Sequence, residues 1–536
     1  MSPIRRQFLT EQKAEKESVS FLAFFVKKLL FVLFLLLCTV SSALLFKYAY
    51  PQHSYSLLAW LALSPFVCAL IRLKSFWSSV FYSWLTGTCV YAGLYYWVYV
   101  TCVEGGGLSV PMGVFCWIGL SFIMAVQFAI FGGSCFYLKK IKSLFAILAA
   151  LGWAALEWAH EMLATYSLGF PWFSLGYSQW NLPQVIQIAS FTGTTGISAL
   201  IAFCSVSVGQ AFAMPQLKRG IMQMFLAAAV FLATYGYGAY VLAQPQPRSL
   251  LRLQAALMQP NIDQYKKWSS EFEQEIMDTI AQMGAELEGK NLMLTIWPES
   301  VSPGPVQEEP YFSLFNDLAQ FSGAWQLVGS NRQEGQQQYV SAFMFSTQEE
   351  FPFYDKVHLV PFGEYIPFRN IIQRLFPQIE ILGALGSFQK GKWDQPLLAV
   401  SQIPFGTTIC YESIFSSRWR SQARAGAKFF VNITNDAWFF DTDAPYQHLA
   451  ISVLRAAELG VPVLRAANTG ISAVISAKGQ ILSRTQLNTR DILWAGVPLA
   501  LSMEETFYTR WGDWFPWVCA AIYFTILLSV MVFSYE

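Results

Sequence analysis

Three residues in the second half of the chain have side chains suited to acyl transfer, and two of them, Glu299 and Cys410, follow segments that read as β-strands. Glu299 lies in TIWPES, Lys356 in FYDKVHLVPFGEY and Cys410 in TTICYES. A carboxylate at a strand end near apolar neighbours can carry protons. An ammonium group can hold an oxyanion, and an activated thiol can attack an acyl carbon. Together these groups could support nucleophilic catalysis by Cys410, although none of them decides a function when taken alone.

Each residue also has an ordinary interpretation when taken alone. Glu299 could be a turn or capping acid, Lys356 a solvated surface lysine, and Cys410 a buried strand cysteine. The other eight cysteines lie in or beside apolar runs, where they can serve as small hydrophobes. Cys410 therefore has no partner within its own region and is either a buried bystander or a reactive thiol.

The elements that would position these residues form an α/β region. From Leu250 onward short β-rich runs alternate with helical stretches. Open α/β sheets present reactive side chains where strands end, which is where Glu299 and Cys410 fall. Strands are expected in LLRLQAALMQ, NLMLTIW, AFMFST, PFGTTIC, KFFVNIT and SAVIS, and helices at Ser269–Leu287 and about Tyr446–Leu459.

The first half of the chain has the composition of a membrane protein. Of the whole sequence 54% is hydrophobic and 13% charged, and only eleven Asp, Glu, Lys or Arg lie between Leu29 and Ala243. A bilayer-spanning helix needs about 20 apolar residues. Eight runs meet this need approximately: Leu29–Phe46, Ser54–Ile71, Trp77–Tyr99, Leu108–Leu138, Leu144–Leu163, Thr194–Met214, Met222–Ala243 and Trp514–Ser534.

Basic residues predict the orientation of these helices, because Lys and Arg are retained on the cytoplasmic side of short loops. Every second loop is basic, starting with the segment before the first helix. The amino terminus is therefore expected inside and the polar region outside the cytoplasm. The basic positions are Arg5, Arg6, Lys13, Lys16, Lys27 and Lys28, then Arg72 and Lys74, then Lys139, Lys140 and Lys142, then Lys218 and Arg219.

These observations divide the chain into four parts. Residues 1–28 are predicted to be a cytoplasmic segment, 29–243 a seven-helix transmembrane domain, 244–510 a periplasmic catalytic domain, and 511–536 a last transmembrane helix with a short tail. The first apolar run is interpreted as a retained anchor, since no small-residue cleavage site is evident.

The order and flanks of the three candidates resemble the nitrilase, or carbon-nitrogen hydrolase, superfamily. The surrounding words are similar to those of its membrane branch, the apolipoprotein N-acyltransferases, and the resemblance spans nearly the whole chain. Pro260 departs from it, since related enzymes often have glycine there. The words are WPES, YDKVHLVPFGEYIPF, ICYES, NITNDAWF, RAANTGIS, GFPWFSLGYSQ (Gly169–Gln179) and MQPNI (Met258–Ile262).

This resemblance implies an αββα sandwich beside a membrane helical bundle, with Glu299, Lys356 and Cys410 as the triad. Trp268, Glu364, Tyr411 and Glu412 carry over as supporting or substrate-binding residues, although Glu364 and Glu412 could equally be ordinary ion pairs. The implied reaction moves the sn-1 acyl chain of a phospholipid through a Cys410 thioester to the α-amino group of a diacylglyceryl-cysteine lipoprotein. It needs neither metal nor nucleotide, and it places a monomer in the bacterial inner membrane.

Residues Ile371 to Phe388 read IIQRLFPQIEILGALGSF, with only two charges. We expect a mobile apolar arm on the bilayer beside the site; a buried helix or strand of the core is the alternative.

Three other functions are compatible with parts of this sequence. A Cys-His hydrolase could use His358 or His448. A membrane-anchored nitrilase-type amidase would keep the triad but hydrolyse amides. A transporter would need charges within the helices, whereas the charges here gather at predicted helix ends. The net charge of +1 and the absence of a basic patch give no indication of nucleic-acid binding.

Overall fold

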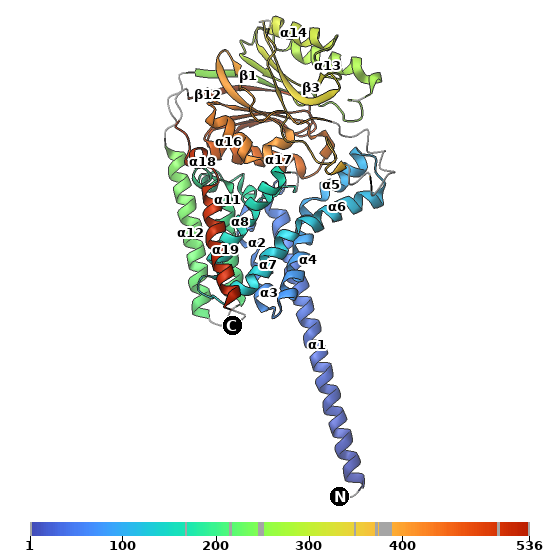
Figure 1. Cartoon of the computed structure of the whole chain (residues 1–536), viewed down its shortest axis with the longest axis vertical. Helices are drawn as coiled ribbons and strands as arrows, with labels where there is room; N and C mark the ends of the chain where they lie inside the picture. The colour runs from blue at the N-terminus through green and yellow to red at the C-terminus, as the bar shows by residue number, and fades with distance from the viewer. Residues whose placement is uncertain are drawn as a thin grey trace.

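The computed structural model describes residues 3–166, 169–213, 217–244, 251–267, 269–347, 350–369, 374, 388–500 and 504–533, without the side chains of 3–22, 217 and 219. A helical bundle and a domain of two β-sheets are stacked end to end, and the first helix projects away from the sheets (Figure 1). Trp268 and almost all of the expected arm, Ile371 to Phe388, lie outside the described residues.

Among the described residues, each of the eight predicted apolar runs is mainly helical. The second run is divided into a 3₁₀ turn and two helices, and the third and fourth runs are each divided into two helices. Short 3₁₀ or π turns occupy Ser56–Leu58, Thr101–Gly105 and Leu175–Gln179. The helices of the bundle are α1 (Pro3–Ala49), α2 (Ala59–Ala62), α3 (Ser64–Arg72), α4 (Phe76–Leu94), α5 (Tyr96–Val100), α6 (Val110–Met124), α7 (Val126–Leu138), α8 (Phe145–Thr165), α9 (Pro183–Ile186), α10 (Ala189–Thr192), α11 (Thr194–Ala213), α12 (Leu217–Ala243), α18 (Phe507–Trp511) and α19 (Trp514–Val532).

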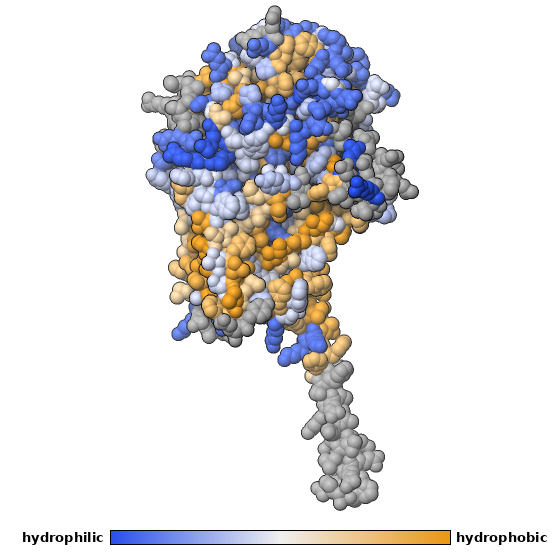
Figure 2. All heavy atoms as spheres, in the orientation of Figure 1, coloured by the Kyte–Doolittle hydropathy of each residue, from blue (hydrophilic) through white to orange (hydrophobic). Residues whose placement is uncertain are grey.

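Within the described residues, five of these helical stretches are long and apolar enough to cross a membrane: Ala23–Ala49, Val110–Leu138, Thr194–Ala213, Gly220–Ala243 and Trp514–Val532. Ser56–Arg72 is apolar but shorter, while α4 and α8 have 19 and 21 residues. Hydrophobic residues cover the sides of the bundle, and hydrophilic residues cover the domain above it (Figure 2). That distribution is typical of a protein whose bundle lies in lipid.

The second part of the chain forms two six-stranded sheets. Their strand orders are β12-β1-β2-β3-β4-β5 and β11-β10-β9-β8-β7-β6, and the central strands of each sheet, β1-β2-β3 and β7-β8-β9, are parallel. The strands are β1 (Leu251–Gln259), β2 (Leu294–Ile296), β3 (Trp325–Glu334), β4 (Gln337–Phe345), β5 (Phe353–Asp355), β6 (Leu398–Val400), β7 (Ile403–Ile409), β8 (Phe430–Thr434), β9 (Val463–Ala467), β10 (Ala473–Ile475), β11 (Ile481–Arg484) and β12 (Asp491–Leu499).

The domain has four layers. Side chains such as Leu257 of β1 and Ile433 of β8 share one buried cluster between the sheets. On the outer face of the first sheet lie α13 (Glu273–Ala285) and α14 (Tyr311–Ser322). On the outer face of the second lie α16 (Ser416–Arg424) and α17 (Ala444–Leu459), between that sheet and the bundle (Figure 1). The expected αββα order is thus present, and every predicted strand and both predicted helices are confirmed.

Helix α17 is enclosed on all sides. Every residue of it except Tyr446 is buried, as expected for a helix packed between a sheet and other helices. Its buried charges, Arg455 and Glu458, therefore need partners, and they find them in the bundle.

Pro260, the departure from the family pattern, follows the last residue of β1. The β1–β12 pairing ends at Gln259 and Asp491, so the missing N–H of proline falls beyond the ladder.

Candidate active site

The three candidate residues lie at strand ends. Lys356 directly follows β5, Cys410 directly follows β7, and Glu299 follows β2 after Trp297 and Pro298. Cys410 opens a 3₁₀ turn, Cys410–Ile414, with a φ of 51°. Few L-residues adopt that left-handed conformation, and such strain is concentrated at functional sites.

Lys356 is fully buried between two carboxylates. Its Nζ donates to Oε1 of Glu299 at 3.0 Å and to Oε1 of Glu364 at 2.5 Å. Burial alone would lower the pKa of Lys356, but Glu299, Glu364 and Cys410 together raise it well above its ordinary value. The group therefore stays a cation at neutral pH, as an oxyanion-binding residue requires.

Both carboxylate oxygens of Glu299 are occupied. Oε1 accepts from Lys356, and Oε2 accepts from the backbone N–H of Asn435 at 2.9 Å. The backbone carbonyl of Glu299 also accepts a hydrogen bond, from Nζ of Lys267 at 3.2 Å. The carboxylate is thus fixed in one orientation, and its negative charge interacts electrostatically with the sulfur of Cys410.

Cys410 is coupled electrostatically to both of these groups. Burial, followed by the negative charge of Glu299, raises the pKa of the Cys410 thiol, while Lys356 and a hydrogen bond with Thr434 lower it in part. The net direction is upward, so the resting group is a thiol. A base is then needed to generate the nucleophile, and Glu299 is the carboxylate that the structure provides there.

The supporting residues Glu412 and Tyr411 have different surroundings. The Glu412 carboxylate is fully buried and accepts from the backbone N–H groups of Val357 (2.6 Å), His358 (3.1 Å) and Ile409 (2.9 Å), and from the Tyr354 hydroxyl (3.0 Å). The Glu412 carboxylate therefore ties the segment that follows Lys356 to β7, the strand that directly precedes Cys410.

Tyr411 faces the bundle instead. Its ring stacks on Phe170, in the GFPW segment, with ring centroids 5.7 Å apart. In the same segment Trp172 donates to Gln447 of α17 at 2.8 Å. The residue after the candidate nucleophile is thus held against a segment contributed by the first half of the chain.

Sequence reasoning missed a pair of asparagines that organise the site. Asn435 orients Glu299 through its backbone, while its side chain accepts from Asn468 and donates to Gln264, both at 3.0 Å. Asn468 in turn brackets Ile262, accepting from its N–H and donating to its carbonyl, each at 2.8 Å. These contacts join the segments NITNDAWF, RAANTGIS and MQPNI. The sequence showed the three motifs, but it did not show that they lie in contact with one another.

The two histidines of the rival hydrolase reading have other partners. His448 lies 2.9 Å from Asp436 and 3.1 Å from the backbone carbonyl oxygen of Cys410. His358 stacks on Phe415 with centroids 3.9 Å apart, and burial lowers its pKa to about 3. Both histidines are thus engaged by other groups: His448 by Asp436 and a backbone carbonyl, and His358 by the Phe415 ring.

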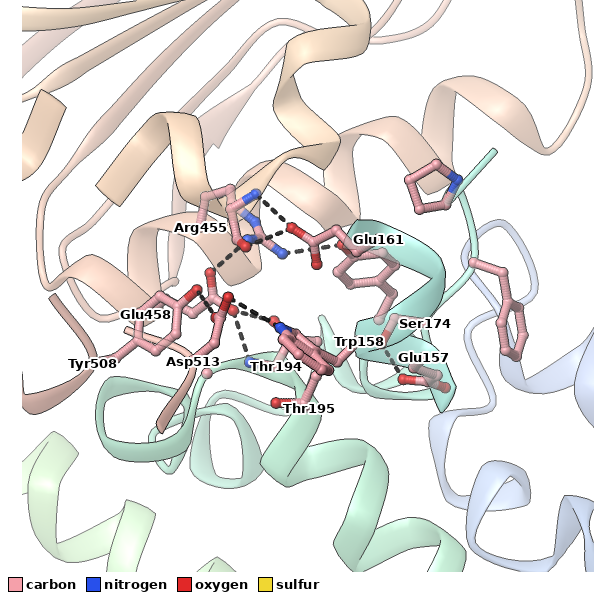
Figure 3. A pocket seen from close by; sticks show the side chains of 15 residues that line it. Glu157, Trp158, Glu161, Ser174, Thr194, Thr195, Arg455, Glu458, Tyr508 and Asp513 are labelled. Carbon is pink, nitrogen blue, oxygen red and sulfur yellow. Dashed lines mark hydrogen bonds and ion pairs between the residues drawn. The ribbon is translucent and has the colours of Figure 1, made fainter. Parts of the chain in front are cut away.

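A small cavity of about 20 Å³ lies where the domain meets the bundle (Figure 3). Beside it, one acidic side chain from each part accepts hydrogen bonds from the first residue of a helix in the other part. Glu161 of α8 accepts from the backbone N–H (3.0 Å) and hydroxyl (2.5 Å) of Ser416, at the start of α16. Glu458 of α17 accepts from the backbone N–H of Thr194, at the start of α11, at 2.7 Å. We call these two contacts the reciprocal caps.

Arg455 completes this junction. It forms an ion pair with Glu458 at 2.8 Å and donates to the Tyr177 hydroxyl at 3.0 Å. Asp513, before α19, accepts from Trp158 and Tyr508, each at 3.2 Å. The junction is separate from the Cys410 centre, but Ser416 connects it to the turn that begins at Cys410.

In the part of the chain that the structure describes, no group of three or more His, Cys, Asp or Glu side chains is placed to hold a metal ion.

Two family models match the chain. The carbon-nitrogen hydrolase model matches residues 254–504, and the model of the apolipoprotein N-acyltransferase N-terminal domain matches residues 42–207. Among solved structures, the chain is similar to a carbon-nitrogen hydrolase superfamily protein of Xanthomonas campestris, at 16% identity and a TM-score of 0.36, covering 46% of this chain and 91% of that one. It is also similar to Nit3 of Saccharomyces cerevisiae, at 17% identity and a TM-score of 0.36, covering 48% of this chain and 93% of that one.

Curated relatives extend over both parts of the chain. The apolipoprotein N-acyltransferase of Geobacter metallireducens is 34% identical over 505 residues, which cover 90% of this chain and 93% of the relative. That of Allorhizobium ampelinum is 32% identical, covering 80% and 81%. Because the likeness includes the bundle and the two-sheet domain alike, the chain belongs to the apolipoprotein N-acyltransferase family, whose catalytic part is a carbon-nitrogen hydrolase domain.

Proposed function

We propose that this protein transfers the sn-1 acyl chain of a phospholipid to the α-amino group of a diacylglyceryl-cysteine lipoprotein, the last step of lipoprotein maturation. One observation carries the proposal: a buried ammonium group, Lys356, holds the carboxylate of Glu299 at 3.0 Å beside a strained, partly exposed cysteine. Family membership supports the acyl-transfer class.

In the first half-reaction Glu299 takes the thiol proton, and the sulfur of Cys410 attacks the ester carbonyl carbon. The oxyanion that forms is held by the Lys356 ammonium group and the backbone N–H of Tyr411. The C–O bond to glycerol then breaks, Glu299 returns its proton to the leaving oxygen, and lysophospholipid departs. A thioester remains on Cys410.

In the second half-reaction the free α-amine of the lipoprotein attacks the thioester carbonyl carbon. Glu299 takes a proton from the amine, the C–S bond breaks, and the proton returns to the sulfur. An amide is released and the resting thiol is restored. Glu364 keeps Lys356 charged, and Glu412 holds the Lys356 and Cys410 loops together; Trp268 is a further substrate-binding candidate.

We also propose that the catalytic domain, residues 244–510, lies on the periplasmic face of the bacterial inner membrane. Residues 29–243 then form seven spans and 511–536 the eighth, residues 1–28 lie in the cytoplasm, and the protein is a monomer. The basic loops support this orientation because they gather at one end of the bundle. Arg72 donates to the Phe212 carbonyl at 3.1 Å, Gln210 donates to the Lys142 carbonyl at 2.8 Å, and Lys139 donates to the Leu73 carbonyl.

The decisive experiment is intact-mass analysis of the purified protein after incubation with phospholipid. We expect an acyl adduct on Cys410 that hydroxylamine removes and that a diacylglyceryl lipopeptide with a free amine discharges. An N-acetylated lipopeptide is the matched acceptor control and should leave the adduct in place. Acylation of the lipopeptide by Cys410→Ser at the wild-type rate would refute the mechanism.

The amidase alternative is not favoured by the relatives, which are named for N-acyl transfer. Hydrolysis of short aliphatic amides at a rate exceeding lipopeptide acylation would reinstate it.

A further inference from the structure

A second buried lysine faces the Cys410 centre. Lys267 is 1% exposed, and its Nζ donates to the backbone carbonyl of Glu299 at 3.2 Å. It is the neighbour of Lys266, which is exposed and paired with Glu275 at 2.8 Å. Two adjacent lysines therefore occupy opposite environments, and only one of them points into the site.

The loop that carries Lys267 is fixed to the same groups that hold the base. Ile262 is bracketed by Asn468, and Gln264 accepts from the side chain of Asn435, whose backbone N–H donates to Glu299. The backbone N–H of Lys267 then closes a turn onto the carbonyl of Asp263 at 3.1 Å. The position of the ammonium group is thus set by the network that orients Glu299.

Holding a carbonyl does not by itself require a charge, because a neutral amide donor would serve. Burying an ammonium group is costly unless negative charge compensates it. Burial lowers the pKa of Lys267 to about 8, although the negative charges of Glu299 and Cys410 act to raise it. The group is therefore a cation at neutral pH, and its charge interacts electrostatically with the Glu299 carboxylate and the Cys410 sulfur.

The charges of the centre balance only when Lys267 is included. Two carboxylates, Glu299 and Glu364, face two ammonium groups, Lys356 and Lys267. Near the sulfur there is also Asp436, whose charge is met by Arg465 at 2.8 Å. Without Lys267, a thiolate or oxyanion would form in a buried site that already carries an uncompensated negative charge, which is unfavourable at low dielectric.

We propose that Lys267 is a positioning residue of the acyl-transfer centre: it fixes the strand end that carries Glu299 and supplies the second positive charge that favours the Cys410 thiolate. This inference rests on the proposed thioester function, but its central claim concerns thiol reactivity and is testable without any lipid.

The experiment is alkylation of Cys410 by iodoacetamide in the full-length protein in detergent micelles, followed by peptide mass spectrometry across about pH 6 to about pH 10. Lys267→Met should react about tenfold more slowly at neutral pH, and throughout the range it should reach a given wild-type rate only about one pH unit higher. Lys267→Arg keeps the charge and should stay within about twofold of wild type. Lys266→Met is the matched control and should be indistinguishable from wild type.

Lys267→Gln keeps a donor for the Glu299 carbonyl but removes the charge, so it should be as slow as Lys267→Met and decides the question if Lys267→Met does not fold. A neutral variant with the wild-type pH profile would overturn the inference. So would Lys267→Arg as slow as the neutral variants at an unchanged melting temperature. Absence of an acyl adduct on wild-type Cys410 would instead refute the proposed function and leave the alkylation result standing.

Discussion

The ammonium nitrogen of Lys356 lies 3.0 Å from a carboxylate oxygen of Glu299, although the two residues are 57 positions apart and follow different strands. Both side chains are buried, at 0% and 8% exposure. A buried pair of this kind is sensitive to loss of either charge. The first prediction therefore removes one charge while keeping the shape.

Glu299→Gln should lower the rate of acyl-adduct formation by about 100-fold or more, because the amide cannot accept the thiol proton. The amide oxygen can still accept from Asn435, but its N–H₂ group then faces the Lys356 ammonium, so the melting temperature is measured beside the rate to separate loss of stability from loss of the base. Single-turnover mass spectrometry with phospholipid measures the rate. Glu275→Gln, at an exposed position of the domain, is the control. An unchanged rate of adduct formation in Glu299→Gln would show that Glu299 is not the base.

Glu364→Gln should shift the alkaline limb of the pH–rate profile to lower pH. Glu364 helps to raise the pKa of Lys356, so its loss lets Lys356 deprotonate at a lower pH and the oxyanion lose its cation sooner. The rate at neutral pH should fall by about tenfold or less. A profile identical to wild type would show that Glu364 is not coupled to the lysine.

Glu412→Gln should lower the stability of the folded protein, and the loss of activity should follow from that loss of stability. One carboxylate oxygen accepts from both Val357 and His358, and the other from Ile409. The amide places an N–H₂ against one of these donor sets, leaving buried groups unpaired at a cost of about 1–3 kcal/mol each. A fall in melting temperature should accompany the loss of activity; full stability with lost activity would indicate a direct chemical role instead.

Strand ends were predictable from the sequence because apolar runs and turn residues are local signals. Two of the strands that escaped prediction, β12 and β9, have local signals against them. β12 contains Gly496 and Pro498, and it is a strand only as the edge partner of β1. β9 carries Arg465 in a fully buried position, which is tolerable only because Asp436 lies 2.8 Å away.

In the candidate site, too, some residues were predictable from local motifs and others were not. Glu299, Lys356 and Cys410 stand in recognisable words, whereas Lys267 and Asn435 acquire their meaning from contacts 32 and 136 residues distant. No periodicity reports such contacts. A single sequence thus indicates the reactive side chains but not the groups that fix them in place.

His358 predicts a pH dependence of stability. Burial lowers its pKa from 6.5 to about 3, so the folded state binds fewer protons than the unfolded state between these values. Its contribution is fully present above pH 6.5 and is lost as pH falls toward 3. His358→Phe, which can still stack on Phe415, should flatten the fall in melting temperature over that range; an equally steep fall would assign the acid sensitivity to other groups.

The reciprocal caps predict unequal effects at their two ends. Glu161→Ala removes the cap of α16 and should cost about 1 kcal/mol. Glu458→Ala also leaves Arg455 as a buried unpaired charge, so it should cost more, about 3–5 kcal/mol. Adding Arg455→Met to Glu458→Ala should recover part of the loss of melting temperature, whereas no recovery would show that the ion pair is not the cause.

The contact between Glu458 and Thr194 joins positions 264 residues apart. Thr194 emerges from the ribosome long before Glu458 does, so its backbone N–H, at the start of α11, has no Glu458 carboxylate to bind until that part of the chain has been made and folded. Completion of the bundle is therefore a late event in biogenesis. A chain truncated before α17 should reach the membrane with α11 unfinished, and such a product is a natural target for proteolytic quality control.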